Sequence, residues 1–203
     1  MKGNCRMFAN LSENLSARGF LPKCFDTRTE AAAYLLENIH GKTVGIGGSR
    51  TVEALDIYDR LCENNTVRWH WKDGPQVCGE ASTSEVYLCS ANGVSEKGEI
   101  VNIDNTGNRV AATLFGPKKV YIILGRNKIV PTLEAAIDRA RNIASPMNAR
   151  RYNLQTPCAQ AEEMRCYDCS SSQRLCRAMV IHMFKPKGLP ECEVLLINED
   201  LGF

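Results

Sequence analysis

The clearest chemical signature in the chain is a set of four cysteines in its last third. Cys158, Cys166, Cys169 and Cys176 lie within nineteen residues, and the middle two form a CxxC pair. Four thiolates satisfy the ligand count of a tetrahedral zinc site and also that of a [4Fe-4S] cluster. Because metal or redox chemistry is more typical of cytosolic cysteines than disulfides are, the spacing predicts a metal centre held by these four side chains.

Two cofactors fit this ligand set. Pro157 before the first cysteine and the lack of histidine in the segment favour a [4Fe-4S] cluster, and zinc is the alternative. Nearby cations lower thiol pKa values and offset the negative charge of a four-thiolate centre. Four free or redox-paired thiols are the competing structural explanation. The arginines that lie among or beside the cysteines are Arg150, Arg151, Arg165, Arg174 and Arg177.

A glycine-rich segment lies between a predicted strand and a predicted helix. Glycines let the backbone approach a ligand closely, and hydroxyl groups and the free amides of a helix start can donate to an anion. The third glycine of the dinucleotide fingerprint is missing, and no lysine follows as in a P-loop. The equally weighted alternative is a tight turn in which Ser49 caps the helix. The candidate ligand-binding residues here are Gly47, Gly48, Ser49, Arg50 and Thr51.

Two further polar turns add candidates. Gly107, Asn108 and Arg109 follow Asp104 in a turn that a β-hairpin would also explain, although Arg109 could bind a carboxylate or phosphate or pair with a structural acid. Asn127 and Lys128 follow the predicted central strand at its carboxyl end, where open α/β sheets bind ligands. Three such loops at one sheet edge would form one pocket for a small anionic metabolite, either a carboxylate or a phosphate.

The catalytic residue is not identified by the sequence. Glu96, Asp104 and Lys128 are the best placed candidates for an acid, a base or a cation, and the competing explanation is that each is a solvated loop residue. The three histidines are scattered along the chain, and the sequence shows no spacing typical of a Ser/His/Asp triad.

Alternating helical and strand patterns must position these groups. Helices are expected at about 7–15, 27–41, 54–61 and 131–145, where Pro131 begins the last and Ser145 with Pro146 breaks it. Strands are expected at 43–46, 67–71, 86–89, 99–104, 110–115, 120–124 and 193–198. This alternation predicts an α/β fold in which helices flank a mostly parallel sheet.

Composition limits the function classes. The 203 residues carry a net charge of +2, which gives no field that would imply nucleic acid. Hydrophobic residues make up 44% of the chain, and no apolar run approaches the ~20 residues of a membrane span. We therefore expect a cytoplasmic protein that binds neither nucleic acid nor membrane, with one domain over 1–203 that includes a cysteine-rich insertion at 150–178. A homo-oligomer is compatible with this composition.

Several segments resemble the LUD-domain family of lactate utilisation proteins. They are GIGGSRTVEAL at 45–55, DNTGNRVAATLFGPKKVYIILGRNKIV at 104–130, SPMNARRYNLQTPC at 145–158, CYDCSSSQRLC at 166–176 and the closing INEDLGF. The resemblance spans essentially the whole chain and implies a fold like that of ribose-phosphate isomerase and the CoA transferases, in which a glycine turn after the first strand faces the ligand. Some relatives are subunits of an iron-sulfur complex that oxidises lactate to pyruvate, whereas this chain resembles the compact branch with its own C-terminal cysteines.

The sequence thus supports a leading function and two alternatives. The leading hypothesis is an iron-sulfur redox protein or subunit linked to the use of lactate or another small carboxylate, working with a redox partner protein. The first alternative is a non-redox isomerase or transferase in which the cysteines hold a structural zinc. The second is a ligand-binding or assembly subunit without chemistry of its own.

Overall fold

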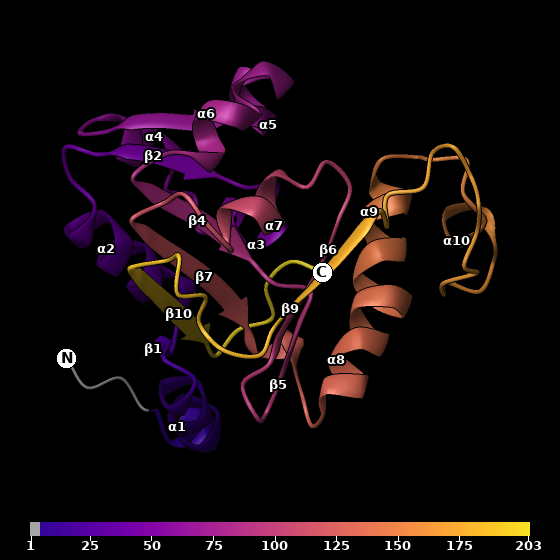
Figure 1. The fold of residues 1–203 in the computed structure, drawn as a ribbon, viewed down its shortest axis with the longest axis horizontal. Helices are drawn as coiled ribbons and strands as arrows, with labels where there is room; N and C mark the ends of the chain where they lie inside the picture. The colour runs from indigo at the N-terminus through magenta and orange to yellow at the C-terminus, as the bar shows by residue number, and fades with distance from the viewer. Residues whose placement is uncertain (1–4) are drawn as a thin grey trace.

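The computed structural model describes residues 5–203 and is built on a six-stranded parallel sheet (Figure 1). All of its strand pairs are parallel, which confirms the predicted α/β fold. In spatial order the strands are β1 (Leu21–Phe25), β10 (Glu191–Ile197), β7 (Lys119–Gly125), β4 (Val86–Ser90), β2 (Thr43–Ile46) and β3 (Thr66–Trp69).

Helices cover both faces of this sheet, so its central strands are apolar on both sides. On β7, Tyr121 and Ile123 pack into one core cluster with α2 (Arg28–Asn38), α3 (Arg50–Glu53) and α4 (Tyr58–Cys62). The alternate β7 side chains Ile122 and Leu124 pack into a second cluster on the opposite face. The helices of that face are α1 (Ala9–Ala17), α6 (Cys78–Ser82) and α7 (Asn108–Ala112).

A second, mixed sheet lies beside the first and was not foreseen from the sequence. Its order is β8 (Ile129–Val130), β5 (Gly93–Ser95), β6 (Ile100–Asp104) and β9 (Ala178–His182). Val101 and Ile103 of β6 pack against Ala136 of α8 (Leu133–Arg139), which covers one face of this small sheet.

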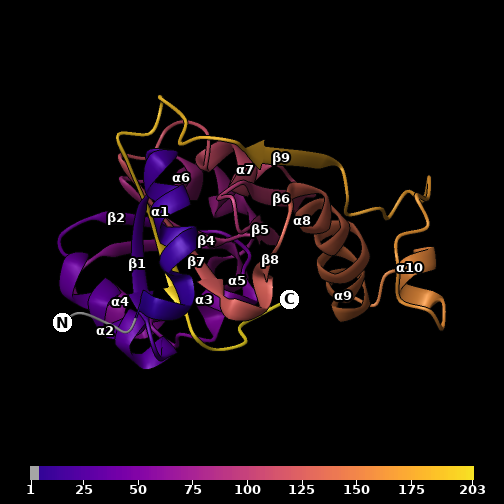
Figure 2. The same cartoon turned by 90° about the horizontal axis from the view of Figure 1, so that it is seen from below.

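The expected break at Ser145 and Pro146 is wrong, because the helix continues through them. A π-helical turn, Ala140–Ala144, joins α8 to α9 (Ser145–Arg151), and the two helices form one rod (Figure 2). Pro146, the second residue of α9, lies just after the π-turn, and such a turn is a local irregularity in which a helix tolerates a residue without an N–H donor.

The predicted strand at 110–115 is also wrong, since α7 occupies its first half. A carboxylate oxygen of Asp104 accepts the backbone N–H of Val110 at 3.2 Å, so the polar turn begins a helix and not the second strand of a hairpin. Likewise the predicted helix at 54–61 is wrong over its first half, because α3 ends at Glu53, Asp56 has a φ of 51° and only residues 58–61 belong to α4.

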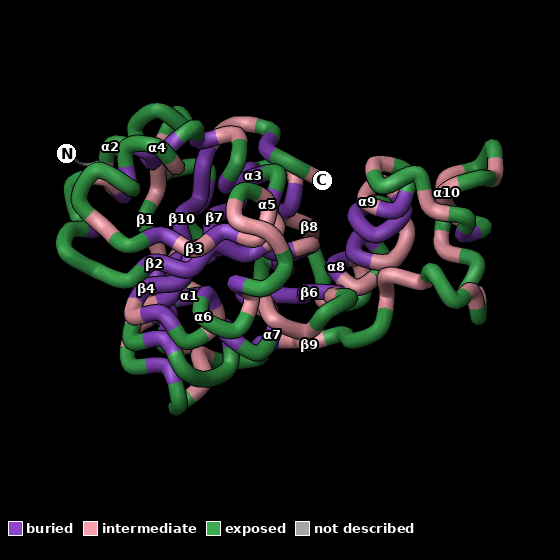
Figure 3. The backbone as a smooth tube through the Cα atoms, turned by 90° about the horizontal axis from the view of Figure 1, so that it is seen from above, coloured by how far each residue is buried: buried purple, intermediate pink, exposed green. Residues whose placement is uncertain are grey.

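The cysteine-rich segment after α9 contains little regular structure. Its only helix among the described residues is α10 (Pro157–Gln160), and the segment projects from the end of the rod as a mostly exposed or half-buried loop (Figure 3). The remaining short helices are η1 (Cys5–Phe8), α5 (His70–Asp73), η2 (Pro75–Val77) and η3 (Arg126–Lys128). Over residues 5–203, none of the helices has the length and apolar character needed to cross a bilayer.

Candidate functional site

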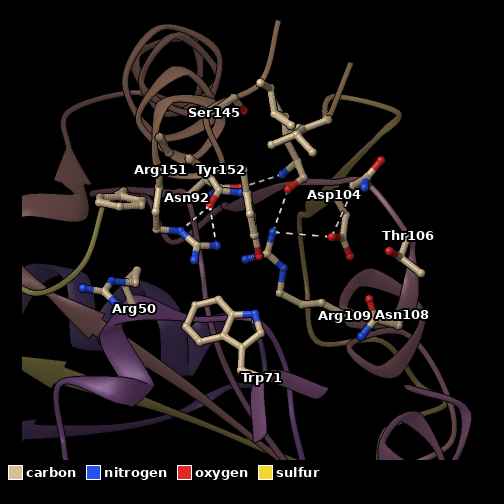
Figure 4. Close-up of a pocket in the computed structure, with 18 of the residues that line it drawn as sticks. Arg50, Trp71, Asn92, Asp104, Thr106, Asn108, Arg109, Ser145, Arg151 and Tyr152 are labelled. Carbon is tan, nitrogen blue, oxygen red and sulfur yellow. Dashed lines mark hydrogen bonds and ion pairs between the residues drawn. The ribbon is translucent and has the colours of Figure 1, made fainter. Parts of the chain in front are cut away.

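A cavity of about 310 Å³ opens between the carboxyl edge of the large sheet and α9 (Figure 4). The ends of β2, β3 and β4 contribute to one wall, the end of β6 and the start of α7 to a second, and α9 to a third. We call it the anion cavity, after the anionic ligand that the sequence leads us to expect at this sheet edge. Its lining residues include Gly48, Arg50, His70, Trp71, Asn92, Asp104, Asn105, Thr106, Asn108, Arg109, Ser145, Asn148, Arg151, Tyr152, Leu175 and Phe203.

The anion cavity carries an excess of positive charge. Arg50, Arg109 and Arg151 line it, Asp104 supplies the one side-chain carboxylate among its described lining residues, and Arg50 also pairs with Glu53 outside the lining. The Arg151 guanidinium lies 3.8 Å from the ring centre of Tyr152 and 4.7 Å from that of Trp71, and it donates to Asn148 Oδ1 at 3.0 and 3.1 Å. These contacts hold Arg151 in place without neutralising its charge.

Several buried donors of this cavity have no hydrogen-bond partner among residues 5–203. They are Trp71 Nε1, Asn108 Nδ2 and Arg109 Nε, together with His70 Nδ1, which donates in one of its tautomers. Burial lowers the pKa of His70, with Asp104 acting in the opposite sense. Because an unpaired buried donor is costly, this arrangement suits a ligand that is rich in hydrogen-bond acceptors.

The glycine turn contributes only part of its predicted residues. Gly48 and Arg50 line the cavity, whereas Gly47, Ser49 and Thr51 do not. A Cβ on Gly48 would lie 3.1 Å from both His70 Nε2 and Trp71 Nε1, so the bare backbone leaves room there. Ser49 caps α3 by accepting the N–H of Val52 at 3.2 Å, as in the structural alternative considered for it.

The second polar turn contributes Asn108 and Arg109, while Gly107 caps α7 from a left-handed conformation at a φ of 90° and lies off the cavity. The two carboxylate oxygens of Asp104 accept the N–H groups of Asn105 and Val110. Arg109 donates to the carbonyl of Ile103 at 2.6 Å and lies 3.9 Å from Asp104. Asp104 therefore holds the turn and lowers the net positive charge of the cavity.

The structure does not bring Asn127, Lys128 and Glu96 to the cavity. Lys128 is buried, its Nζ donates to Ser90 Oγ and the Ala91 carbonyl at 3.0 Å, and burial, followed by Arg139 and Arg109, lowers its pKa. Asn127 accepts the N–H of Leu201 at 3.1 Å and fastens the segment that ends in Phe203. Glu96 is exposed and lies at the opposite end of β6 from Asp104.

All four predicted cysteine ligands line one smaller cavity of about 20 Å³, which we call the cysteine cavity. Each of the four thiols is free and partly buried. The Cys166 sulfur accepts the N–H of Asp168 at 3.4 Å and a guanidinium N–H of Arg141 at 3.7 Å. Thr156 Oγ1 lies 3.3 Å from the Cys158 sulfur.

The thiols share this cavity without surrounding a single point. Within residues 5–203, no group of three or more His, Cys, Asp or Glu side chains is arranged to hold a metal ion. Zinc requires its sulfur ligands at about 2.3 Å from one centre, whereas a cubane cluster separates its four thiolates. The four cysteines therefore match a cluster in ligand number and share one cavity, but that cavity is about the size of one water molecule, so a cluster would require their side chains to move apart.

The two cavities are neighbours. Ser145 and Leu175 line both of them. Burial raises the pKa of the Cys176 thiol, and a hydrogen bond from Ser145 opposes that rise, so the shared wall contacts a cysteine directly. On the same rod, Asn142 Oδ1 accepts the N–H of Cys166 at 2.8 Å.

Sequence reasoning missed much of the anion cavity. His70 and Trp71 were expected inside the strand at 67–71, whereas β3 ends at Trp69, so the carboxyl-end argument that selected Lys128 was not applied to them. Ser145, Asn148 and Arg151 gave no such signal, because they belong to a helix that the sequence predicted to have ended.

Comparisons with known proteins agree with this architecture. A DUF162 family protein from Deinococcus radiodurans has a similar structure, with a TM-score of 0.58 and 11% sequence identity over 95% of this chain and 97% of that chain. No curated protein matches the chain. The sequence matches the LUD domain over residues 8–197, which is nearly its full length. The chain therefore belongs to the LUD-domain family of lactate utilisation proteins.

Proposed function

We propose that the chain is an iron-sulfur redox protein for lactate or another small anionic metabolite, with Cys158, Cys166, Cys169 and Cys176 as the ligands of a [4Fe-4S] cluster. The observation that carries the proposal is that these four cysteines, which span nineteen residues of irregular chain, all line one cavity. When bound, the cluster supplies a one-electron donor and acceptor.

The surroundings of the cysteine cavity support this assignment. Arg141 and Arg174 line it and would offset the negative charge of four thiolates. The N–H of Asp168 and the guanidinium of Arg141 already donate to the Cys166 sulfur, and hydrogen bonds to sulfur are among the features that set cluster potentials.

The anion cavity would hold the metabolite. Arg109 and Arg151 would bind its acidic group, and the wall formed by Ser145 and Leu175 would keep it next to the cysteine cavity. Oxidation of a 2-hydroxy acid to a 2-oxo acid releases two electrons and two protons, which exceeds what one cluster accepts at a time. A redox partner protein that removes electrons is therefore part of the proposal.

Metal analysis of anaerobically purified protein tests the redox half. We expect about four iron and four sulfide per chain with the visible and paramagnetic signatures of a cubane cluster. Cys169→Ser should lose the iron, whereas Cys62→Ser, at an exposed free cysteine outside the set, should keep it. Stoichiometric zinc without iron, or equal iron in the two variants, would refute the assignment.

A second candidate is a non-redox enzyme or ligand-binding protein whose cysteines hold a structural zinc. It is favoured by one observation, namely that the three arginines and the unpartnered donors of the anion cavity all come from outside the cysteine-rich loop after α9. In that case chelation should lower the melting temperature while anion binding persists.

A further inference from the structure

We infer that the ligand of the anion cavity carries a phosphoryl group, and specifically that it is a phosphate monoester of a small metabolite. This inference rests on the anion-binding half of the proposed function, and between lactate and another small anionic metabolite it selects the second, a phosphate ester. It does not depend on what the cysteines hold.

The first argument is the number of donors that await a partner. Trp71 Nε1, Asn108 Nδ2 and Arg109 Nε are buried without a hydrogen bond, and His70 Nδ1 is in the same condition. All four line the cavity, and every unpartnered buried side-chain atom among its described lining residues is a nitrogen. The guanidinium of Arg151 has no carboxylate partner and adds further N–H groups.

The second argument is the acceptor capacity of the two anions that the cavity could take. A carboxylate offers two oxygens with about four lone-pair sites. The four unpartnered nitrogens would use all of them, and nothing would remain for Arg151. A phosphoryl group presents three strong acceptor oxygens in different directions, which suits donors that come from three separate elements, α5, α7 and α9.

The third argument is charge and size. The side chains that line the cavity comprise three guanidinium groups and one carboxylate, a net side-chain charge of +2, and Arg50 also pairs with Glu53 outside the lining. A phosphate monoester carries about −1.5 to −2 at pH 7, whereas a simple carboxylate carries −1. The volume of about 310 Å³ is at the lower end of the range for small-molecule sites and exceeds the needs of a free phosphate ion.

The test exploits two neighbouring tryptophans. Trp71→Phe removes the N–H that faces the cavity but keeps an aromatic ring under Arg151. Trp69→Phe is the matched control, because Trp69 Nε1 is also buried and unpartnered, yet Trp69 does not line the cavity. Calorimetric titrations would use inorganic phosphate and glycerol phosphate as probes, with acetate and lactate as competitors.

We expect both phosphate probes to bind, and a tenfold excess of acetate or lactate to leave the phosphate affinity unchanged. Trp71→Phe should weaken phosphate binding about tenfold, whereas Trp69→Phe should leave the phosphate affinity unchanged. Tighter binding of lactate than of phosphate, no phosphate binding, or equal effects of the two variants would overturn the inference. If Trp71→Phe does not fold, Asn108→Ala serves as the test variant in its place, because it removes a second unpartnered donor. Iron analysis of the same samples reports separately on the redox half of the proposed function.

Discussion

Asp104 offers a test in which removal of a charge should strengthen binding. Its carboxylate faces a cavity lined by three arginines, and its two oxygens accept the N–H groups of Asn105 and Val110. Asp104→Asn keeps an acceptor oxygen and removes the charge, whereas Asp104→Ala removes both. The two variants therefore separate the electrostatic role of Asp104 from its role in beginning α7.

The structure sets the expected magnitudes. Asp104 and Arg109 lie 3.9 Å apart, with side chains 13% and 12% exposed. Two charges at that distance attract by about 1 kcal/mol in water and about 4 kcal/mol at an effective dielectric constant of about 20. Since the pair is close to solvent, we expect Asp104→Asn to tighten phosphate binding by about 1 to 2 kcal/mol, which is roughly fivefold to thirtyfold in Kd.

Stability should respond differently. Loss of the capping oxygens in Asp104→Ala should cost about 0.5 to 2 kcal/mol, which lowers the Tm by roughly 2 to 4 °C per kcal/mol, while Asp104→Asn should retain most of the wild-type Tm. Calorimetric titration with phosphate and thermal melts followed by circular dichroism check both effects. Weaker phosphate binding by a normally stable Asp104→Asn would refute this reasoning, because Asp104 would then help Arg109 to bind the anion.

Three further outcomes are expected. Gly48→Ala places a methyl group 3.1 Å from His70 Nε2 and Trp71 Nε1, so phosphate affinity should fall about tenfold with little change in Tm. An unchanged affinity in calorimetry would count against this cavity as the phosphate site. Folding lowers the pKa of Lys128, so at pH values between that lowered pKa and about 10.4 the unfolded chain binds more protons than the folded one. In this range the free energy of unfolding therefore rises with pH. Urea unfolding between pH 7 and 10 should therefore show a gain for wild type relative to Lys128→Met, and parallel curves would contradict the assignment. Asn127→Ala should release the segment from Leu201 onward, seen as faster hydrogen exchange at the Leu201 amide, whereas a role as a direct ligand would change anion affinity without that exchange.

Local rules predicted much of the fold. The helix expected at 27–41 is α2, which begins with a capping box of Thr27 and Glu30, and the apolar run of β7 lies at the centre of a parallel sheet. The strand at 110–115 failed because its β-forming residues follow a capping carboxylate six positions before Val110, and that hydrogen bond selects a helix.

The site was predicted less completely because its parts come from distant segments. Arg109 was found from its position beside a glycine turn, and the four cysteines from their spacing. Arg151 was noted only as a cation near the cysteines, since its place against Trp71 requires two segments eighty residues apart to meet. Such a meeting follows from packing of the rod on the sheet edge and leaves no periodic signal in the sequence.

The π-turn at Ala140–Ala144 sets the rotational phase between the two ends of the rod. Within the turn lie Arg141 and Asn142, which contact Cys166, and after it lie Ser145, Asn148 and Arg151, which line the anion cavity. One residue of an α-helix corresponds to about 100° of rotation, so deletion of a single alanine from the turn would swing every later side chain by about that angle. A protein with such a deletion could keep its helices and its cysteines. The anion cavity and the cysteine cavity, however, would no longer be aligned along the rod.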